Sequence, residues 1–380
     1  MTAFSLLTRT DRDAASTRRG GIDLTIEDIG ARAASFPAFD GHELVLHARA
    51  PSVGLDAIVA IHDTTLGTPL GGTRMRPYRS RDEAITDALR LSRAMTMKSA
   101  MAGLDLGGGK AALIGDPATD KSAALMHAYG DFLNRIDGRF SAGQDAGLSV
   151  ADLDRIAEVT PHVFGSSLRG GGDPSPDTAI GVALGIGASV RHRMGAKSLS
   201  GVAVAVQGLG HVGAALCDIL AEQGARLFVA DVDSARIAAT VARTGATAVA
   251  PSDIHRAAAD VFAPCALGGV LDDATIGELR CAIVAGAANN PLGAEIHGEA
   301  LRRRGILYAP DYVINAGGLI HVASELHGWG REDTLARIRR IAATLAEIFA
   351  RADAEGVATN AVAERMARER IAREKGRGKR

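Results

Sequence analysis

The sequence predicts an α/β fold in two domains, and three observations carry this prediction. The chain has 380 residues, which is enough for two separate hydrophobic cores. Apolar runs typical of strands alternate with segments of helical periodicity along most of its length. The segment Gly165–Pro176 is dense in Gly, Ser and Pro, a composition typical of a hinge or domain boundary.

Bulk composition indicates an ordinary globular protein. Hydrophobic residues make up 47% of the chain and charged residues 23%, and no apolar run is long enough to span a bilayer. The 43 basic and 44 acidic side chains nearly cancel, so we expect no nucleic acid and no membrane as a partner. Cys217, Cys265 and Cys281 form no CxxC pair, so we expect neither a disulfide framework nor a metal site, as in a reducing cytoplasm.

The first half of the chain alternates strand-like and helix-like segments. Leu44–Leu46 and Ala57–Ile61 are apolar runs typical of strands. Ser80–Glu83 is a capping box that opens a helix, and Lys98 lies near the C-terminal end of that helix. The next expected elements are a strand over Ala111–Ile114, a helix over Ala123–Ile136 and a helix start at Ser149–Asp152.

Two lysines flank a glycine-rich segment between Met95 and Lys110, where we expect a turn whose backbone can approach a small ligand. Lys98 suits a fixed cation for a carboxylate, and Lys110 suits a desolvated amine that acts as a base near neutral pH. A nucleotide P-loop is excluded, since Leu104 stands where that motif needs Gly and Ala111 where it needs Ser or Thr. Taken alone, these residues also allow a surface turn with two solvated lysines.

A second motif begins with the apolar run Val202–Gln207, which leads into G-x-G-x-x-G, a helical repeat, another apolar run and then Asp231. This order is that of a dinucleotide-binding unit of the Rossmann type, in which the glycines allow a tight turn, close approach of a pyrophosphate and close helix packing. The N-terminus of the helix supplies N–H groups for the phosphates, and Asp231 at the ribose favours NAD over NADP. The loop residues expected at the cofactor are Gly208, Leu209, Gly210, His211, Val212 and Gly213.

The remaining chain continues the same alternation. Val261–Ala263, Ala282–Ala285 and Ile306–Ala309 are spaced like successive strands of a parallel sheet. From Arg331 onward the pattern is helical, and the basic end Arg370–Arg380 is expected to be a solvated tail.

From about Phe39 onward the chain resembles the amino-acid dehydrogenases related to glutamate dehydrogenase, and within them phenylalanine dehydrogenases first and leucine dehydrogenases next. The two-lysine segment and the dinucleotide unit carry this resemblance. Further matching stretches are Ala60–Leu66, Gly71–Met75, Asp173–Ala179, Ala263–Gly268, Ala285–Asn290 and Ala309–Gly318.

The resemblance implies an organisation for the whole chain. Residues 1–35 are expected to form an extension outside the folded domains. Residues 36–168 together with 345–380 would form an α/β domain for substrate binding and oligomerisation. Residues 169–344 would form the Rossmann-type NAD-binding domain, with a cleft between the two. We expect a cytoplasmic homo-oligomer that acts on an L-amino acid, its 2-keto acid and ammonium.

The resemblance also implies roles for single residues. Lys110 and Asp145 would be catalytic, Lys98 would hold the substrate carboxylate and Asn315 would orient the substrate; taken alone, Asp145 is a turn or capping residue. Further substrate contacts are expected at Gly71, Gly72 and Met75, and further cofactor contacts at Thr178, Cys265, Ala266, Ala287, Asn289 and Asn315.

The same resemblance places Leu70, Gly143, Leu319 and Val322 around the substrate side chain. Leucine dehydrogenases typically carry Ala at the first and Val at the second of the positions that are Gly143 and Leu319 here, whereas phenylalanine dehydrogenases carry Gly and Leu. Removing a methyl group at 143 makes room for a flat ring. We therefore expect NAD-dependent oxidative deamination of L-phenylalanine, with branched-chain amino acids as the close alternative and tryptophan also allowed.

Two alternatives belong to other classes. A non-catalytic NAD-binding relative would keep the fold without turnover. A 2-hydroxy-acid dehydrogenase would use a His acid–base with an Arg clamp, and no such pair stands beside the glycine-rich segment.

Overall fold

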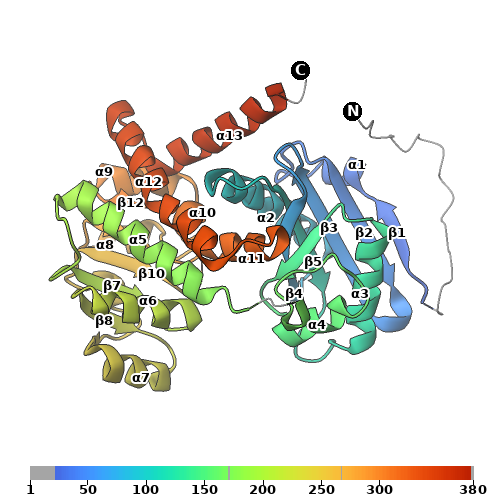
Figure 1. Ribbon diagram of the computed structural model, residues 1–380, viewed down its shortest axis with the longest axis horizontal. Helices are drawn as coiled ribbons and strands as arrows, with labels where there is room; N and C mark the ends of the chain where they lie inside the picture. Colours follow the sequence, from blue (N-terminus) through green and yellow to red (C-terminus); the bar gives the residue numbers. More distant parts are fainter. Residues whose placement is uncertain (1–21, 170–171, 267, 378–380) are drawn as a thin grey trace. The chain divides into compact units, whose positions relative to one another are not determined.

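The computed structural model describes residues 22–169, 172–266 and 268–377 (Figure 1). The chain divides into two compact units. The first consists of the described residues of Met1–Thr96 and Leu106–Gly171, and the second of those of Met97–Asp105 and Gly172–Arg380. None of the helices in these ranges has a stretch apolar and long enough to cross a membrane.

The first unit is built on a six-stranded mixed sheet with the order β1-β2-β3-β5-β4-β6. The pairs from β1 through β3 to β5 are antiparallel, and β5, β4 and β6 run parallel. The strands are β1 (Thr25–Asp28), β2 (Leu44–Ala50), β3 (Leu55–Asp63), β4 (Pro69–Arg76), β5 (Gly107–Ile114) and β6 (Ser141–Gln144). The helices are α1 (Gly30–Ala33), η1 (Pro51–Val53), α2 (Arg81–Met101), α3 (Ala123–Arg135), α4 (Val150–Ala157) and η2 (Ser167–Arg169).

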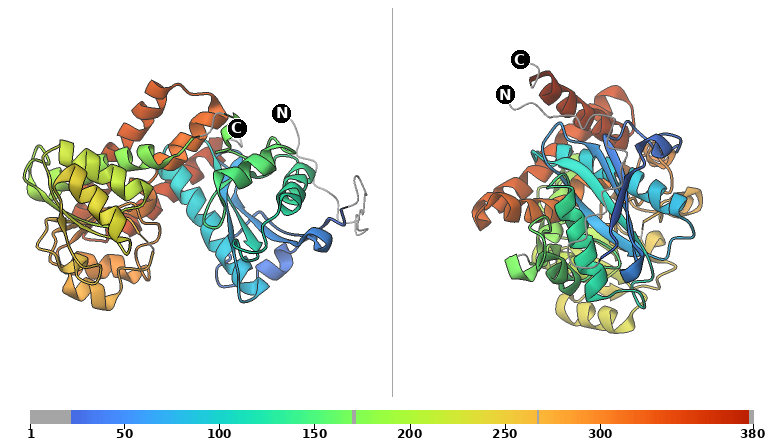
Figure 2. Two further views of the ribbon diagram at one scale, coloured as in Figure 1. Left: turned by 90° about the horizontal axis from the view of Figure 1, so that it is seen from below. Right: turned by 90° about the vertical axis from the view of Figure 1, so that its right-hand side faces the viewer.

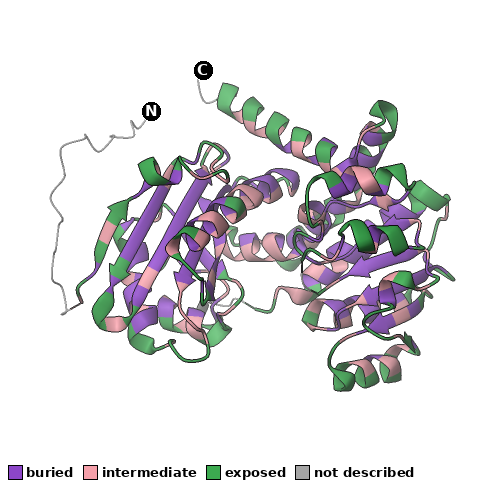
Figure 3. Cartoon of the chain, turned by 180° about the vertical axis from the view of Figure 1, so that it is seen from behind, coloured by how far each residue is buried: buried purple, intermediate pink, exposed green. Residues whose placement is uncertain are grey.

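Helices cover both faces of this sheet, which explains why β3 is apolar along its whole length. Val59 and Ile61 face the core formed with α3 and α4, whereas Ile58 and Ala60 face the core formed with α1 and α2. Figure 3 shows the strands as mostly buried. The sheet therefore carries two hydrophobic cores, and side chains at alternate positions enter different ones.

The first unit begins earlier than expected. Residues 1–21 lie outside the described residues, but residues 22–35 are part of the fold. Strand β1 pairs with β2, and Leu24 and Ile29 are buried at 3% and 7% exposure. The alternation of apolar residues there is short, so the sequence did not distinguish this edge strand from an extension.

The three glycines before Lys110 lie in β5 and not in a turn. The strand is central, with β3 on one side and β4 on the other. A Cβ at Gly108 would lie 2.0 Å from Thr96 Oγ1, and one at Gly109 would lie 2.5 Å from the Phe140 ring. Glycine is required here because α2 and Phe140 pack against the two faces of the strand. The prediction of a turn at these glycines was therefore wrong.

The second unit is built on a six-stranded, fully parallel sheet with the order β12-β11-β10-β7-β8-β9. Residues 172–377 of this unit are coloured from green to red in Figure 2. The chain moves from β7 outward in one direction, then returns to β10 and moves outward in the other, so the order reverses between β7 and β10. The strands are β7 (Ala203–Gln207), β8 (Arg226–Ala230), β9 (Thr247–Ala248), β10 (Val261–Pro264), β11 (Ile283–Val284) and β12 (Leu307–Tyr308). The α/β two-domain prediction, with a Rossmann-type second part, is confirmed.

The helices of the second unit include the segment expected to begin at Arg331. They are α5 (Ser175–Met194), α6 (His211–Glu222), α7 (Ser234–Thr244), η3 (Ile254–Arg256), α8 (Asp273–Glu278), α9 (Ile296–Arg303), α10 (Asp311–Ile314), α11 (Gly317–His327), α12 (Arg331–Glu355) and α13 (Thr359–Arg377).

The C-terminal segment differs from the expected domain assignment. Residues 345–377 lie in the second unit, whereas the resemblance assigned 345–380 to the first domain. Helix α12 packs closely on α5, where a Cβ at Gly185 would lie 3.0 Å from Leu345 Cδ1. Arg370 is also no solvated tail, since its guanidinium donates to the carbonyl oxygens of Ser99 and Ala100 at 3.1 and 2.8 Å.

Candidate functional site

Lys110 and Asp145 form an ion pair in the first unit, in which the lysine is buried and the aspartate is half-buried. Lys110 lies in the middle of β5 with 6% exposure, and its Nζ donates to Asp145 Oδ2. Gly72 on β4 leaves the room that this pair occupies, because a Cβ there would lie 2.8 Å from Asp145 Cβ and 3.1 Å from Lys110 Nζ. The structure thus brings together two residues that are 35 positions apart in the sequence.

The register of the strands explains why Lys110 and Asp145 lie close together. Strands β4, β5 and β6 are parallel, with Gly72 opposite Gly143 on β6, and Asp145 follows the last residue of β6 directly. Carboxyl ends of parallel strands meet at one edge of a sheet, which is where α/β folds commonly place ligands. Lys110 reaches this edge with its long side chain.

Arg74 is a third member of the cluster, and it was not among the expected site residues. Its Nε lies 3.2 Å from Asp145 Oδ2, and its Nη1 lies 3.1 Å from Oδ2 of Asp87 on α2. Burial by itself would raise the pKa of Asp145, but the charges of Lys110 and Arg74 outweigh burial and lower that pKa to about 2. Asp145 is therefore a carboxylate at all ordinary pH values.

Side chains of β4 alternate between the two faces of the sheet, so the expected substrate residues on this strand lie in different surroundings. Leu70 shares a face with Gly72, is 2% exposed and pairs with Ser141 at the start of β6. A Cβ at Gly143 would have only Gly71 O within 4 Å, at 3.8 Å, so this glycine borders open space among the described residues. Met75 is 1% exposed in the core on the α3 side, so we assign it to the core and not to the substrate.

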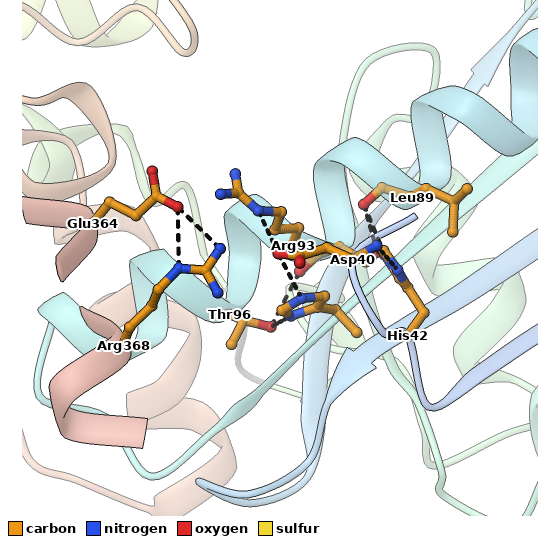
Figure 4. Close-up of polar contacts among 9 residues, drawn as sticks. Asp40, His42, Leu89, Arg93, Thr96, Glu364 and Arg368 are labelled. Carbon is orange, nitrogen blue, oxygen red and sulfur yellow. Dashed lines mark hydrogen bonds and ion pairs between the residues drawn. The ribbon is translucent and has the colours of Figure 1, made fainter. Parts of the chain in front are cut away.

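Helix α2 is anchored in the first unit just before Lys98, which belongs to the second unit (Figure 4). Burial lowers the pKa of His42 to about 4, which suits a neutral ring that bridges two groups of this helix. The anchoring contacts are His42 Nε2 to Leu89 O at 3.0 Å, His62 Nδ1 to Thr96 Oγ1 at 2.8 Å and Arg93 Nε to Asp40 Oδ2 at 2.8 Å.

In the second unit, the glycine loop between β7 and α6 has the geometry that a dinucleotide needs. Gly208 has φ +95°, a conformation that L side chains rarely adopt. A Cβ at Gly213 would lie 1.9 Å from Gly208 O, whereas one at Gly210 would meet no heavy atom within 4 Å. Helix α6 begins at His211 without a side-chain cap, so its first N–H groups are available to an anion.

Asp231 lies at the end of β8 and is held by backbone groups. Its Oδ2 accepts from Leu209 N at 2.6 Å and its Oδ1 from Asp233 N at 2.9 Å. Burial would raise its pKa, but these hydrogen bonds lower it. The next residue, Val232, is 95% exposed, and this bare aliphatic side chain suits contact with a flat base.

A second cluster joins Asn315, Asn289 and Lys98. Asn315 is 5% exposed, and its Nδ2 donates to Ala287 O at 3.1 Å and to Asn289 Oδ1 at 2.9 Å. Lys98 Nζ donates to the same Asn289 oxygen at 3.2 Å. Within the described part of the chain, Asn315 Oδ1 is buried without a hydrogen-bond partner, which is the condition of an acceptor awaiting a ligand donor.

Three other expected cofactor residues of the second unit pack against the glycine loop or against α11. Cys265 and Ala266 follow β10 and pack on the glycine loop, since a Cβ at Gly208 would lie 2.8 Å from Ala266 Cβ. Thr178 Oγ1 donates to Pro174 O at 3.0 Å and lies against α11, which carries Leu319 and Val322.

These residues fit a bound dinucleotide. The positive φ of Gly208, the open space at Gly210, the uncapped start of α6 and the carboxylate of Asp231 are the features that a pyrophosphate and a ribose require. No group of three metal-ligating side chains gathers anywhere in the described residues.

Comparisons with known proteins agree with this geometry. The dimerisation domain profile of the Glu/Leu/Phe/Val dehydrogenases matches residues 42–161, and the Glutamate/Leucine/Phenylalanine/Valine dehydrogenase profile matches residues 232–377. Leucine dehydrogenase from Geobacillus stearothermophilus is 48% identical, with 87% of this chain and 90% of that protein covered. Phenylalanine dehydrogenase from Bacillus thermotolerans is 45% identical, with 91% of each chain covered.

Solved structures give the same result. The crystal structure of L-tryptophan dehydrogenase from Nostoc punctiforme has a TM-score of 0.78 at 45% identity, and covers 88% of this chain and 97% of that one. A glutamate dehydrogenase from Thermus thermophilus, 24% identical with a TM-score of 0.70, covers 92% of this chain and 88% of its own and shares the fold. The chain therefore belongs to the Glu/Leu/Phe/Val dehydrogenase family and is an NAD(P)-dependent amino-acid dehydrogenase.

Proposed function

We propose that this protein catalyses the NAD-dependent oxidative deamination of L-phenylalanine and the reverse reductive amination of phenylpyruvate. In the forward direction an amino acid, NAD⁺ and water give a 2-keto acid, ammonium, NADH and a proton. NAD, when bound, supplies the hydride chemistry. The residues of the chain bind, orient and move protons around that transfer.

The single observation that supports this chemistry most is the ion pair between the buried Lys110 and the half-buried Asp145. A hydrogen-bonded amine and carboxylate can pass one proton between them and a substrate group. In the proposed reaction Asp145 exchanges protons with the substrate nitrogen. Lys110, as the neutral amine, takes a proton from the water that attacks the imine carbon, and the resulting ammonium donates to the oxygen of the adduct. Asp145 protonates the nitrogen, so that the C–N bond breaks as the carbonyl forms.

Residues of the second unit are proposed to hold the substrate and the cofactor. Lys98 would neutralise the substrate carboxylate, and Asn315 Oδ1 would accept from the substrate amino group, which would satisfy its unpaired acceptor. Thr178 and Asn289 would hold the nicotinamide end. Asp231 supports NAD over NADP, because a carboxylate facing a 2′-phosphate would be repelled.

The preference for phenylalanine is supported by Gly143. The space beside this glycine would accept a methyl group without a clash. The missing Cβ therefore leaves more room for a substrate side chain beside Gly72, which pairs with Gly143, and near Leu70. The family relatives matched here carry leucine, tryptophan and phenylalanine in their names, so the branched-chain reading remains the alternative. The dimerisation domain match supports a homo-oligomer.

The test is the rate of NADH consumption with ammonium, comparing phenylpyruvate with indolepyruvate and the keto acids of leucine and valine. We expect the highest kcat/KM with phenylpyruvate. In Gly143→Ala the ratio of kcat/KM for phenylpyruvate to that for the leucine keto acid should fall by about 5- to 100-fold, which corresponds to about 1–3 kcal/mol. An unchanged ratio in the variant would remove Gly143 from the specificity pocket.

A further inference from the structure

Arg74 occupies an unusual place between two carboxylates of the first unit. It stands on β4, two residues after Gly72 and on the same face of the sheet, while its neighbours Thr73 and Met75 are 0% and 1% exposed in the opposite core. Three quarters of its side chain is covered, since 25% remains exposed. A guanidinium that is largely covered needs protein acceptors for those donor groups that water does not reach.

The guanidinium divides its donors between two acids. Its Nε edge faces Asp145 Oδ2 at 3.2 Å, whereas its Nη1 lies 3.1 and 3.4 Å from the two oxygens of Asp87. Tyr78 OH donates to Asp87 Oδ2 at 2.8 Å. A continuous chain of contacts therefore runs from Tyr78 through Asp87 and Arg74 to Asp145.

The contact with Asp145 falls on a particular oxygen. Arg74 and Lys110 both donate to Oδ2, while Oδ1 accepts from the backbone N–H of Ala146 at 2.7 Å. Two cations on one oxygen fix the plane of the carboxyl group. If Arg74 were absent, Oδ2 would keep only the flexible ammonium of Lys110, and the backbone N–H of Ala146 on Oδ1 would be the one rigid donor left to orient the carboxylate.

We propose that Arg74 is a positioning residue that holds the carboxylate of Asp145 for proton exchange, and that Asp87 and Tyr78 keep Arg74 in place. This inference rests on the proposed role of Asp145. It predicts that the planar fork matters as well as the charge, so Arg74→Lys restores only part of the function.

The charge of Arg74 has a separate consequence for pH dependence. Burial raises the pKa of Asp145, and Lys110 and then Arg74 counter it. Without Arg74 the pKa of Asp145 rises, so the carboxylate protonates at a higher pH than in the wild type. The groups facing Asp145 are Lys110 from β5 and Arg74 from β4, with Asp87 on α2 behind Arg74.

The experiment compares the pH profile of kcat/KM for reductive amination in the wild type, Arg74→Gln, Arg74→Lys and Asp87→Asn. Arg74→Gln should lower kcat by about 10- to 100-fold with little change in the KM for NADH, and should move the acid limb to higher pH. Arg74→Lys should bring the acid limb back to its wild-type pH and recover part of kcat. Asp87→Asn should reduce kcat less than Arg74→Gln does.

Arg81→Gln is the matched control, because Arg81 likewise forms an ion pair with an aspartate, Asp56, at 3.1 Å. Among the described residues no hydrogen bond or ion pair joins Arg81 to Asp145 or Asp87. It should keep the wild-type kcat and acid limb. Wild-type kinetics in a folded Arg74→Gln protein would overturn the inference. If Arg74→Gln does not fold, wild-type kinetics in Asp87→Asn would overturn it.

The inference can fail separately from the proposed function. Absence of turnover in the wild type would remove the proposed function, and the titration of the Asp145 carboxyl carbon by NMR would then test Arg74 directly. A higher titration point in Arg74→Gln than in the wild type supports the inference, and an equal one contradicts it.

Discussion

At the scale of single residues, close approach of backbone atoms decides much of this molecule. Gly72 makes room for Lys110 and Asp145, and Gly213 makes room for the carbonyl of Gly208. The glycine at 210 differs from these, because nothing in the described residues lies within 4 Å of the position of its missing Cβ. Absence of a side chain therefore serves packing at Gly72 and Gly213 and leaves open space at Gly210.

This difference predicts opposite behaviour for two substitutions in the glycine loop. Gly213→Ala should lower the melting temperature and NADH affinity together, since its Cβ would collide with Gly208 O. Gly210→Ala should melt like the wild type but bind NADH at least about 10-fold more weakly, because its methyl group would occupy the space of the pyrophosphate. Differential scanning fluorimetry and NADH fluorescence titration measure the two effects. Unchanged NADH affinity in Gly210→Ala would place the phosphates elsewhere.

At the scale of elements, a buried carboxylate joins three helices of the second unit. Asp177 on α5 is 2% exposed, and its Oδ2 accepts from His321 Nδ1 on α11 at 2.7 Å. Its Oδ1 accepts from Arg331 Nη1 at the start of α12 at 2.6 Å. Helix α11 also carries Leu319 and Val322, so this contact fixes the helix that the substrate pocket is proposed to use.

We expect Asp177→Asn to lower the free energy of unfolding by about 1–3 kcal/mol at pH 7, because charge-assisted hydrogen bonds to His321 and Arg331 are lost. Burial raises the pKa of Asp177 but these two partners lower it below the usual value. Its contribution is therefore fully present above the unfolded pKa of about 4 and is lost as pH falls through the lower folded value. Urea unfolding at several pH values measures this.

The exposed pair His192–Asp353 offers the control. Asp353 also accepts from a histidine, at 2.9 Å, but its side chain is 71% exposed. Asp353→Asn should change the free energy of unfolding much less than Asp177→Asn. Equal effects from the two variants would show that burial of Asp177 adds nothing to the strength of its contacts.

At the scale of the whole molecule, the sequence predicted the fold class and the dinucleotide unit, and it named Lys110 and Asp145, which the structure brings together. The roles of the site residues stay predictions. The fold class and the dinucleotide unit have local signatures, such as the glycine loop with its strands and Asp231. The strand position of the three glycines before Lys110 was missed, because only contacts from α2 and Phe140 show why glycine is needed there.

Two other features depend on contacts between distant segments. Nothing in the helical pattern after Arg331 says that α12 packs on α5 in the second unit. Arg74 stands in a stretch that was identified, but its role follows from the parallel register that brings β4 beside β6 and thus beside Asp145. Because side chains alternate along a strand, the sequence alone indicates that Arg74 lies on the same face as Gly72. Its partner on that face, Asp145, is known only from the structure.

The central claim is that this chain turns over amino acids through Lys110. The most direct measurement is the ammonium-dependent rate of NADH consumption in the wild type, Lys110→Ala and Lys121→Ala, together with NADH binding. Lys121 is the matched control, since it also pairs with an aspartate, Asp152, at 2.8 Å in the first unit. We predict turnover in the wild type and Lys121→Ala, and a loss of at least about 100-fold in Lys110→Ala with NADH binding intact. A near-normal rate in Lys110→Ala, or no ammonium-dependent turnover in the wild type, would contradict the claim.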